Sequence, residues 1–125
     1  MPQADTPAPT PQAHANLDRQ AQFLLDIAQA LHISGLHSYE LERQLNSVGQ
    51  QLGIRVVCFA VLTMITLNLT AEDGTQRVVM ARLPPYDYNM ARLIALEELL
   101  TRIDGANSLE RCEAELKQIM GTPPL

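Results

Sequence analysis

The sequence predicts an α+β domain: a three-stranded, mostly antiparallel sheet covered by about four helices, in the order α-α-β-β-β-α-α. Three observations lead to this prediction. Apolar residues recur at helical spacing in the first and last thirds of the chain, and at alternate positions in the middle. An Asp-Gly pair, typical of hairpin turns, separates two of the expected strands. The length of 125 residues suits a single domain with its own core.

The composition limits the partners and the chemistry. The net charge is −5 and no cluster of Lys and Arg occurs, so nucleic acid is a poor electrostatic partner. Cys58 and Cys112 lie in apolar periodic surroundings, which favours reduced buried thiols and leaves a disulfide between them open. The sequence has no Cys-x-x-Cys motif, no Walker loop and no dinucleotide fingerprint, so we expect no metal site and no cofactor.

The two ends of the chain are rich in proline. Residues 1–15 also carry several Ala and Gln, and we expect them to form a disordered or extended tail. This segment lacks the basic and apolar regions of a signal peptide. The expected domain covers residues 16–120, and residues 121–125 form a Pro-rich end.

Two helices are expected before the sheet. The first runs from about Asn16 to Ile33, and Gly35 ends it in the left-handed conformation. Ser38 caps the second helix, which ends at Gly53. Both have apolar positions at helical spacing, which indicates that they cover a core. In the second helix these positions are Leu41, Leu45, Val48 and Leu52.

The stretch from Ile54 to Leu69 is the most apolar part of the chain and admits two interpretations, a membrane span or central strands. Its uncharged run is shorter than the roughly 20 residues that a spanning helix needs, and it ends at a hairpin signal. Strands are therefore favoured. Val56–Val61 is apolar at nearly every position, so we expect a strand covered on both faces. A second strand alternates up to Leu69, and a third covers Gln76–Leu83.

Two helices are expected after the sheet. Asn89 suits the N-cap of a helix that continues to about Ile103. Ser108 suits the cap of a shorter helix, which ends near Gly121. The apolar face of this last helix consists of Leu109, Cys112, Leu116 and Ile119.

Two groups of polar residues are candidate sites. Ser38 beside His37, with His32 nearby in sequence, contains the residue types of a serine hydrolase, but the Gly-x-Ser-x-Gly turn is missing and a capping role is favoured. Tyr86, Asn89 and Arg92 lie at a helix start, where a small amino or organic acid could bind. An ordinary cap after a Pro-rich connection explains the second group equally well, and we favour it.

Several motifs together resemble the N-terminal region of the threonine/serine exporter family. One is the Gly-x-x-Ser-x-x-Leu-Glu start of the second helix, which ends in Leu-Gly. Another is the Asn-Met-Ala-Arg-Leu start of the third helix, and the final Ser-Leu-x-x-Cys-x-x-x-Leu-x-x-Ile helix matches as well. The family often has Pro and Gly where this chain has Leu62 and Met64. The family motif residues in this chain are Gly35, Ser38, Leu41, Glu42, Gly53, Asn89 and Leu93.

The resemblance implies a function in transport. It suggests a cytoplasmic N-terminal domain of an inner-membrane exporter of small amino or organic acids, with a structural, gating or assembly role and no catalytic activity. The expected partner is a transmembrane half that is absent from this chain. Two alternatives remain, a domain that senses an amino or organic acid and a serine hydrolase-like domain. An apolar face left on the first strand or first helix would favour a homo-oligomer.

Overall fold

The computed structural model confirms the α+β class and the order of the elements. It describes residues 11–36, 38–61, 63–83, 85, 88–103 and 109–121. The elements are α1 (Pro11–Ile33), α2 (Ser38–Leu52), β1 (Arg55–Val61), β2 (Met64–Thr70), β3 (Gln76–Arg82), α3 (Met90–Thr101) and α4 (Leu109–Gly121).

The sheet has the strand order β1-β2-β3, and both strand pairs are antiparallel. The stretch that raised the question of a membrane span therefore forms β1 and β2. The predicted hairpin turn joins β2 to β3, with Gly74 at φ 90 and the Thr75 N–H donating to Asp73 Oδ1 at 2.9 Å. Within the described residues, every helix is too short or too polar to cross a membrane.

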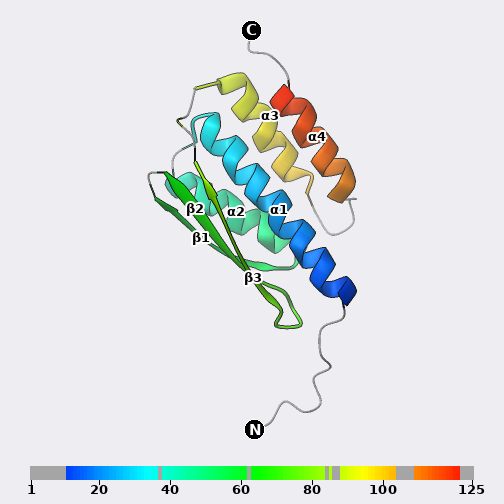
Figure 1. The fold of residues 1–125 in the computed structure, drawn as a ribbon. Helices are drawn as coiled ribbons and strands as arrows, with labels where there is room; N and C mark the ends of the chain where they lie inside the picture. Colours follow the sequence, from blue (N-terminus) through cyan, green and yellow to red (C-terminus); the bar gives the residue numbers. More distant parts are fainter. Residues whose placement is uncertain are drawn as a thin grey trace, which may run out of the picture.

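The molecule is built in three layers, with all helices on one side of the sheet (Figure 1). Helix α1 packs on β2 and β3 and α2 packs on β1, while α3 and α4 pair with each other and contact α1. Because α1 lies between two layers, it is buried on most sides. Its buried residues are Leu17, Ala21, Phe23, Leu24, Leu25, Ile27, Ala28, Ala30 and Leu31.

Helix α1 begins at Pro11, five residues earlier than the expected start at Asn16. Residues 11–15, which we had assigned to the extended tail, are therefore helical. Proline is well tolerated in the first turn, where its missing N–H has no helical partner. The residues that follow it, Gln12 to Ala15, have adequate helix propensity. Residues 1–10 lie outside the described residues.

The prediction that β1 is covered on both faces is wrong. Val56 is buried and Cys58 half-buried beneath α2, but Phe59 and Val61 are 63% and 64% exposed on the other face. A run of apolar residues does not indicate on which side of a strand the helices will pack. Here the helices all lie on one side, so half of the apolar residues of β1 face outward.

Helix α2 approaches the sheet closely at Gly49, a position that the sequence analysis did not single out. A Cβ atom there would lie 2.5 Å from Val56 Cγ2 and 3.1 Å from the Ile54 carbonyl oxygen. The Ile54 N–H also donates to the Gly49 carbonyl at 2.9 Å. The absence of a side chain thus allows α2 to turn directly into β1 through Gly53, which has φ 77.

Candidate functional site

The strongest cluster of predicted site residues lies where the end of α1 meets the start of α3. Helix α1 ends in a Schellman motif: the Leu36 N–H donates to the Leu31 carbonyl and the Gly35 N–H to the His32 carbonyl, both at 3.0 Å. Gly35 has φ 109, so the expected left-handed end of the first helix is confirmed. This motif fixes the direction in which the chain leaves α1.

Asn89 caps α3, as predicted. Its backbone is extended, and its Oδ1 accepts a hydrogen bond from the Arg92 N–H at 3.0 Å. The Asn89 N–H in turn donates to the carbonyl of Ser34 at 3.2 Å. The cap of one helix is thereby joined to the end of another that lies more than fifty residues earlier in the sequence.

Arg92 completes this joint. Its Nε donates to the hydroxyl of Ser34 at 2.9 Å, and Ser34 is completely buried. A buried hydroxyl requires a hydrogen-bond partner, and Arg92 provides one from the first turn of α3. We call the contacts among Ser34, Asn89 and Arg92 the α1–α3 joint.

Tyr88 lies against the α1–α3 joint. A Cβ atom at Gly35 would lie 2.7 Å from Tyr88 Cδ2, so the ring sits close to the backbone of the glycine. The Tyr88 side chain is otherwise largely exposed. The predicted ligand residue Tyr86 lies outside the described residues, as do His37 and the side chain of Ser38.

The geometry of the α1–α3 joint is primarily that of a structural connection. The predicted pair Asn89 and Arg92 is brought together, but Asn89 Oδ1 serves the helix cap and Arg92 Nε serves Ser34. A guanidinium has five N–H donors, and Ser34 takes one of them. The joint thus offers the hydrogen-bond donors of the Arg92 guanidinium, which is held in place beside the N-terminus of α3.

Two shallow hollows elsewhere on the described surface do not involve the joint. One, of about 380 Å³, lies between Gln20, Gly53 and Glu72. The other, of about 370 Å³, lies between Asp26 and the α4 residues Glu113 and Lys117. Among the residues that the structure describes, no group of three His, Cys, Asp or Glu side chains is placed to hold a metal ion.

The remaining family motif residues are placed for packing or for turns. Leu41 and Leu93 are buried in the core, and Gly53 provides the left-handed turn after α2. Glu42 lies near Cys58: burial of the thiol, with a smaller contribution from this carboxylate, raises the pKa of Cys58 to about 12. Cys58 is therefore protonated at neutral pH and is a poor nucleophile.

The cysteine question left open by the sequence is settled by the structure. Cys58 and Cys112 are not joined by a disulfide. Cys112 is buried on α4, and Cys58 is half-buried on β1. Both therefore fit the favoured interpretation of reduced thiols in apolar surroundings.

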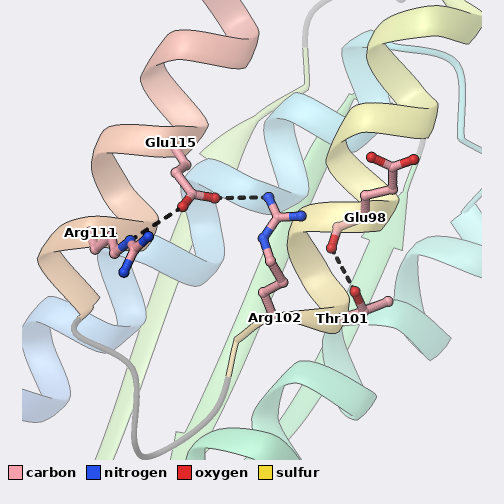
Figure 2. A network of polar contacts seen from close by, with 5 residues as sticks. All are labelled: Glu98, Thr101, Arg102, Arg111 and Glu115. Atoms are coloured by element: carbon pink, nitrogen blue, oxygen red, sulfur yellow. Dashed lines mark hydrogen bonds and ion pairs between the residues drawn. The ribbon is translucent and has the colours of Figure 1, made fainter.

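The α3–α4 pair carries a polar network on its outer side (Figure 2). Arg102 Nη2 lies 2.8 Å from Glu115 Oε2, and Arg111 Nε lies 3.7 Å from Glu115 Oε1. The Thr101 hydroxyl donates to the Glu98 carbonyl at 2.7 Å at the end of α3. Both arginine side chains are more than half exposed and Glu115 is partly exposed, so the network orients the two helices more than it stabilises them.

The sequence pointed to Asn89 and Arg92, the two residues of the joint at the start of α3, but not to Ser34. A serine one residue before a helix-ending glycine is too common to suggest a partner almost sixty residues away. Only the three-layer arrangement places its hydroxyl against Arg92.

One comparison with known proteins gave a match. A family model described as "Putative threonine/serine exporter" matches residues 22–125. The matched range includes most of α1 and every later element. No curated protein and no solved structure gave a match.

Proposed function

The chain belongs to the threonine/serine exporter family, and from this membership we propose that it forms the cytoplasmic N-terminal domain of an inner-membrane exporter of small amino or organic acids. In this proposal the domain has a structural, gating or assembly role and catalyses no reaction itself. Its partner is the transmembrane half of the exporter. The proposal follows from the extent of the match, which takes in all three layers of the fold.

The surface of the helices supports a domain that faces water. Helix α2 pairs Arg43 with Glu40 at 2.9 Å on its exposed side. Helices α1 and α4 are joined at the surface by Arg19 and Glu113, whose closest atoms lie 2.8 Å apart. Charged pairs on outward faces suit contact with solvent, because burying them in lipid would be strongly unfavourable.

The α1–α3 joint supports a structural role in preference to a sensing role. Its hydrogen bonds connect the helix layer next to the sheet with the outer helix pair. A domain that transmits movement or guides assembly needs such a fixed connection between its layers. For the serine hydrolase alternative, His37 and the side chain of Ser38 lie outside the described residues, so no geometry supports a catalytic pair there.

The proposal predicts where the domain is found in the cell. In the native host, the protein carrying an N-terminal epitope tag should sediment with inner-membrane vesicles. Added protease should remove the tag from inside-out vesicles and leave it intact in right-side-out vesicles, because only the former expose the cytoplasmic side. Protection in inside-out vesicles and cleavage in right-side-out ones would contradict the cytoplasmic placement. Recovery of the tag only in the membrane-free supernatant would contradict membrane attachment.

A further inference from the structure

The outer face of the sheet, opposite the helices, is unusually apolar. A sheet with one solvated face normally alternates apolar residues inside with polar residues outside. Here Phe59, Val78 and Met80 are each more than 60% exposed, and Val57 and Met64 are more than 40% exposed. We call the outward-facing residues of β1, β2 and β3 the outer sheet face. Its exposed large apolar residues are Val57, Phe59, Val61, Met64, Val78 and Met80.

The strand register arranges these residues in columns. Phe59 lies beside Thr66, and Thr66 beside Met80, so one row across the sheet is apolar, polar and apolar. The adjacent row repeats this order as Val57, Asn68 and Val78. The outer sheet face therefore has apolar columns on β1 and β3 with a polar column on β2 between them.

The charges of the outer sheet face lie at two corners. Arg55 is at the end of β1 beside Thr70, and Arg82 is at the diagonally opposite end on β3. The three strands are described throughout, and none of their outward-facing residues is acidic. The nearest acidic residues are Glu72 and Asp73 in the β2–β3 turn, at the same end of the sheet as Arg55 and the opposite end from Arg82.

The N-terminal segment of the chain is a poor cover for this face. Residues 1–10 include three prolines and only one large apolar side chain, Met1. A partner must instead present apolar columns on either side of a polar one, together with acidic groups near one corner. The outer sheet face of a second copy has these columns, and the β2–β3 turn of that copy carries Glu72 and Asp73 beside the face.

We propose that two copies of this chain pack outer sheet face to outer sheet face, related by a twofold axis that crosses the strands. This axis lays each strand over its own equivalent in the second copy, running in the reverse direction. Apolar columns then meet apolar columns, with Phe59 over Val57 of the second copy and Met80 over Val78. The polar residues Thr66 and Asn68 meet each other and can form hydrogen bonds across the interface.

The same axis provides charge complementarity. Arg82 of each copy comes to lie over Gln76 of the other copy, beside the turn that carries Glu72. Two Arg–carboxylate contacts thus form at opposite ends of the interface. An axis parallel to the strands would instead place Arg55 beside this turn and Arg82 over Val61. Arg55 already lies at the same end of the sheet as Glu72 of its own copy, whereas Arg82 has no acidic residue at its end among the described residues of the strands and their turns. The crossing axis therefore gives Arg82 an acidic neighbour in the second copy.

The size of the face predicts a weak dimer. Seven residues per strand at about 3.4 Å each, and three strands about 4.8 Å apart, give a flat area of about 340 Å² per copy. Two copies would bury about 700 Å² by this measure, below the roughly 1,200–2,000 Å² of stable complexes. The protruding side chains make the buried area somewhat larger than this flat estimate. The dimer should therefore form at high concentration and dissociate on dilution.

Sedimentation equilibrium over about a hundredfold range of concentration tests this proposal. The wild-type chain should pass from monomer to dimer, and Phe59→Glu should weaken dimerisation by at least about tenfold. Ile94→Glu is the matched control, because Ile94 is also an exposed apolar residue but lies on α3. Circular dichroism should show that both variants fold, and Val78→Lys provides a second probe of the face if Phe59→Glu does not fold.

A charge exchange tests the axis. Arg82→Glu should weaken the dimer, and the double variant Arg82→Glu/Glu72→Arg should recover much of the loss. A wild-type chain that stays monomeric at every concentration would overturn the proposal and leave the face to a different protein. Equal weakening by Ile94→Glu and Phe59→Glu would also overturn it. Sensitivity to Arg55→Glu with no effect of Arg82→Glu would overturn the crossing axis.

Discussion

Replacement of Phe23 by alanine should lower the free energy of unfolding by about 3–5 kcal/mol, the range typical of a large aromatic residue removed from a core. Phe23 is completely buried on α1, the helix between the sheet and the outer helix pair. Aromatic residues make up only 4% of the chain, so aliphatic side chains fill most of the core. A cavity at Phe23 would be surrounded by packed elements on both sides and has little room to collapse.

Urea denaturation followed by circular dichroism would measure this loss. Ile94→Ala is a suitable control, because Ile94 is about half exposed on α3. Its effect should stay within about 0.5 kcal/mol. Since small domains are stable by only about 5–15 kcal/mol, Phe23→Ala should bring the protein close to unfolding at physiological temperature. Equal stability of the two variants would show that α1 is not the centre of the core.

Replacement of Arg92 by leucine should destabilise the protein by about 1–3 kcal/mol, the usual effect of depriving a buried polar group of its partner. The affected group is the hydroxyl of Ser34, which accepts from Arg92 Nε and is completely buried. Ser34→Ala should have a smaller effect, because it removes the group that needs a partner. Thermal or chemical denaturation of both variants would measure the difference.

The double variant Ser34→Ala/Arg92→Leu is the control for the joint. If the two residues act mainly through each other, its destabilisation should be clearly smaller than the sum of the single effects. Additive effects would instead mean that Arg92 acts elsewhere. An increase in the melting temperature of the wild-type chain with threonine, serine or a dicarboxylate, lost in Arg92→Leu, would favour the sensing role over the structural one.

Local sequence signals predicted most of the fold. Helix ends were found because Gly35 and Gly53 must take left-handed conformations that other residues avoid, and Asn89 was found because its side chain can cap a helix. The hairpin followed from Asp73 and Gly74 in the same way. These signals depend on a few adjacent residues, so a sequence carries them without knowledge of the tertiary structure.

The errors arose where the answer depends on distant elements. The apolar character of β1 predicted two covered faces, but the position of every helix on one side of the sheet leaves Phe59 exposed. Gly49 had no visible role until the approach of α2 to Val56 was known. The helix start at Pro11 was missed because a proline-rich segment resembles an extended tail, although the first turn of a helix tolerates proline.

The candidate site was predictable only in part. Asn89 and Arg92 were recognised because they flank a helix start, and they do lie together. Their partner Ser34 comes from the end of a different helix, and no local pattern in the sequence connects it with α3. The consequence is a change of interpretation, from a candidate ligand site to a joint between layers.

The most direct test of the proposed transport function is the rate at which cells release threonine. Native-host cells from which the coding sequence of this domain has been deleted in frame would be loaded with a threonine-containing dipeptide, and threonine would be followed inside and outside the cells. Membership in the exporter family predicts slower efflux and higher intracellular threonine than in the wild type, with recovery when the intact gene is returned. Unchanged efflux of threonine, serine and dicarboxylates in the deletion strain would contradict it.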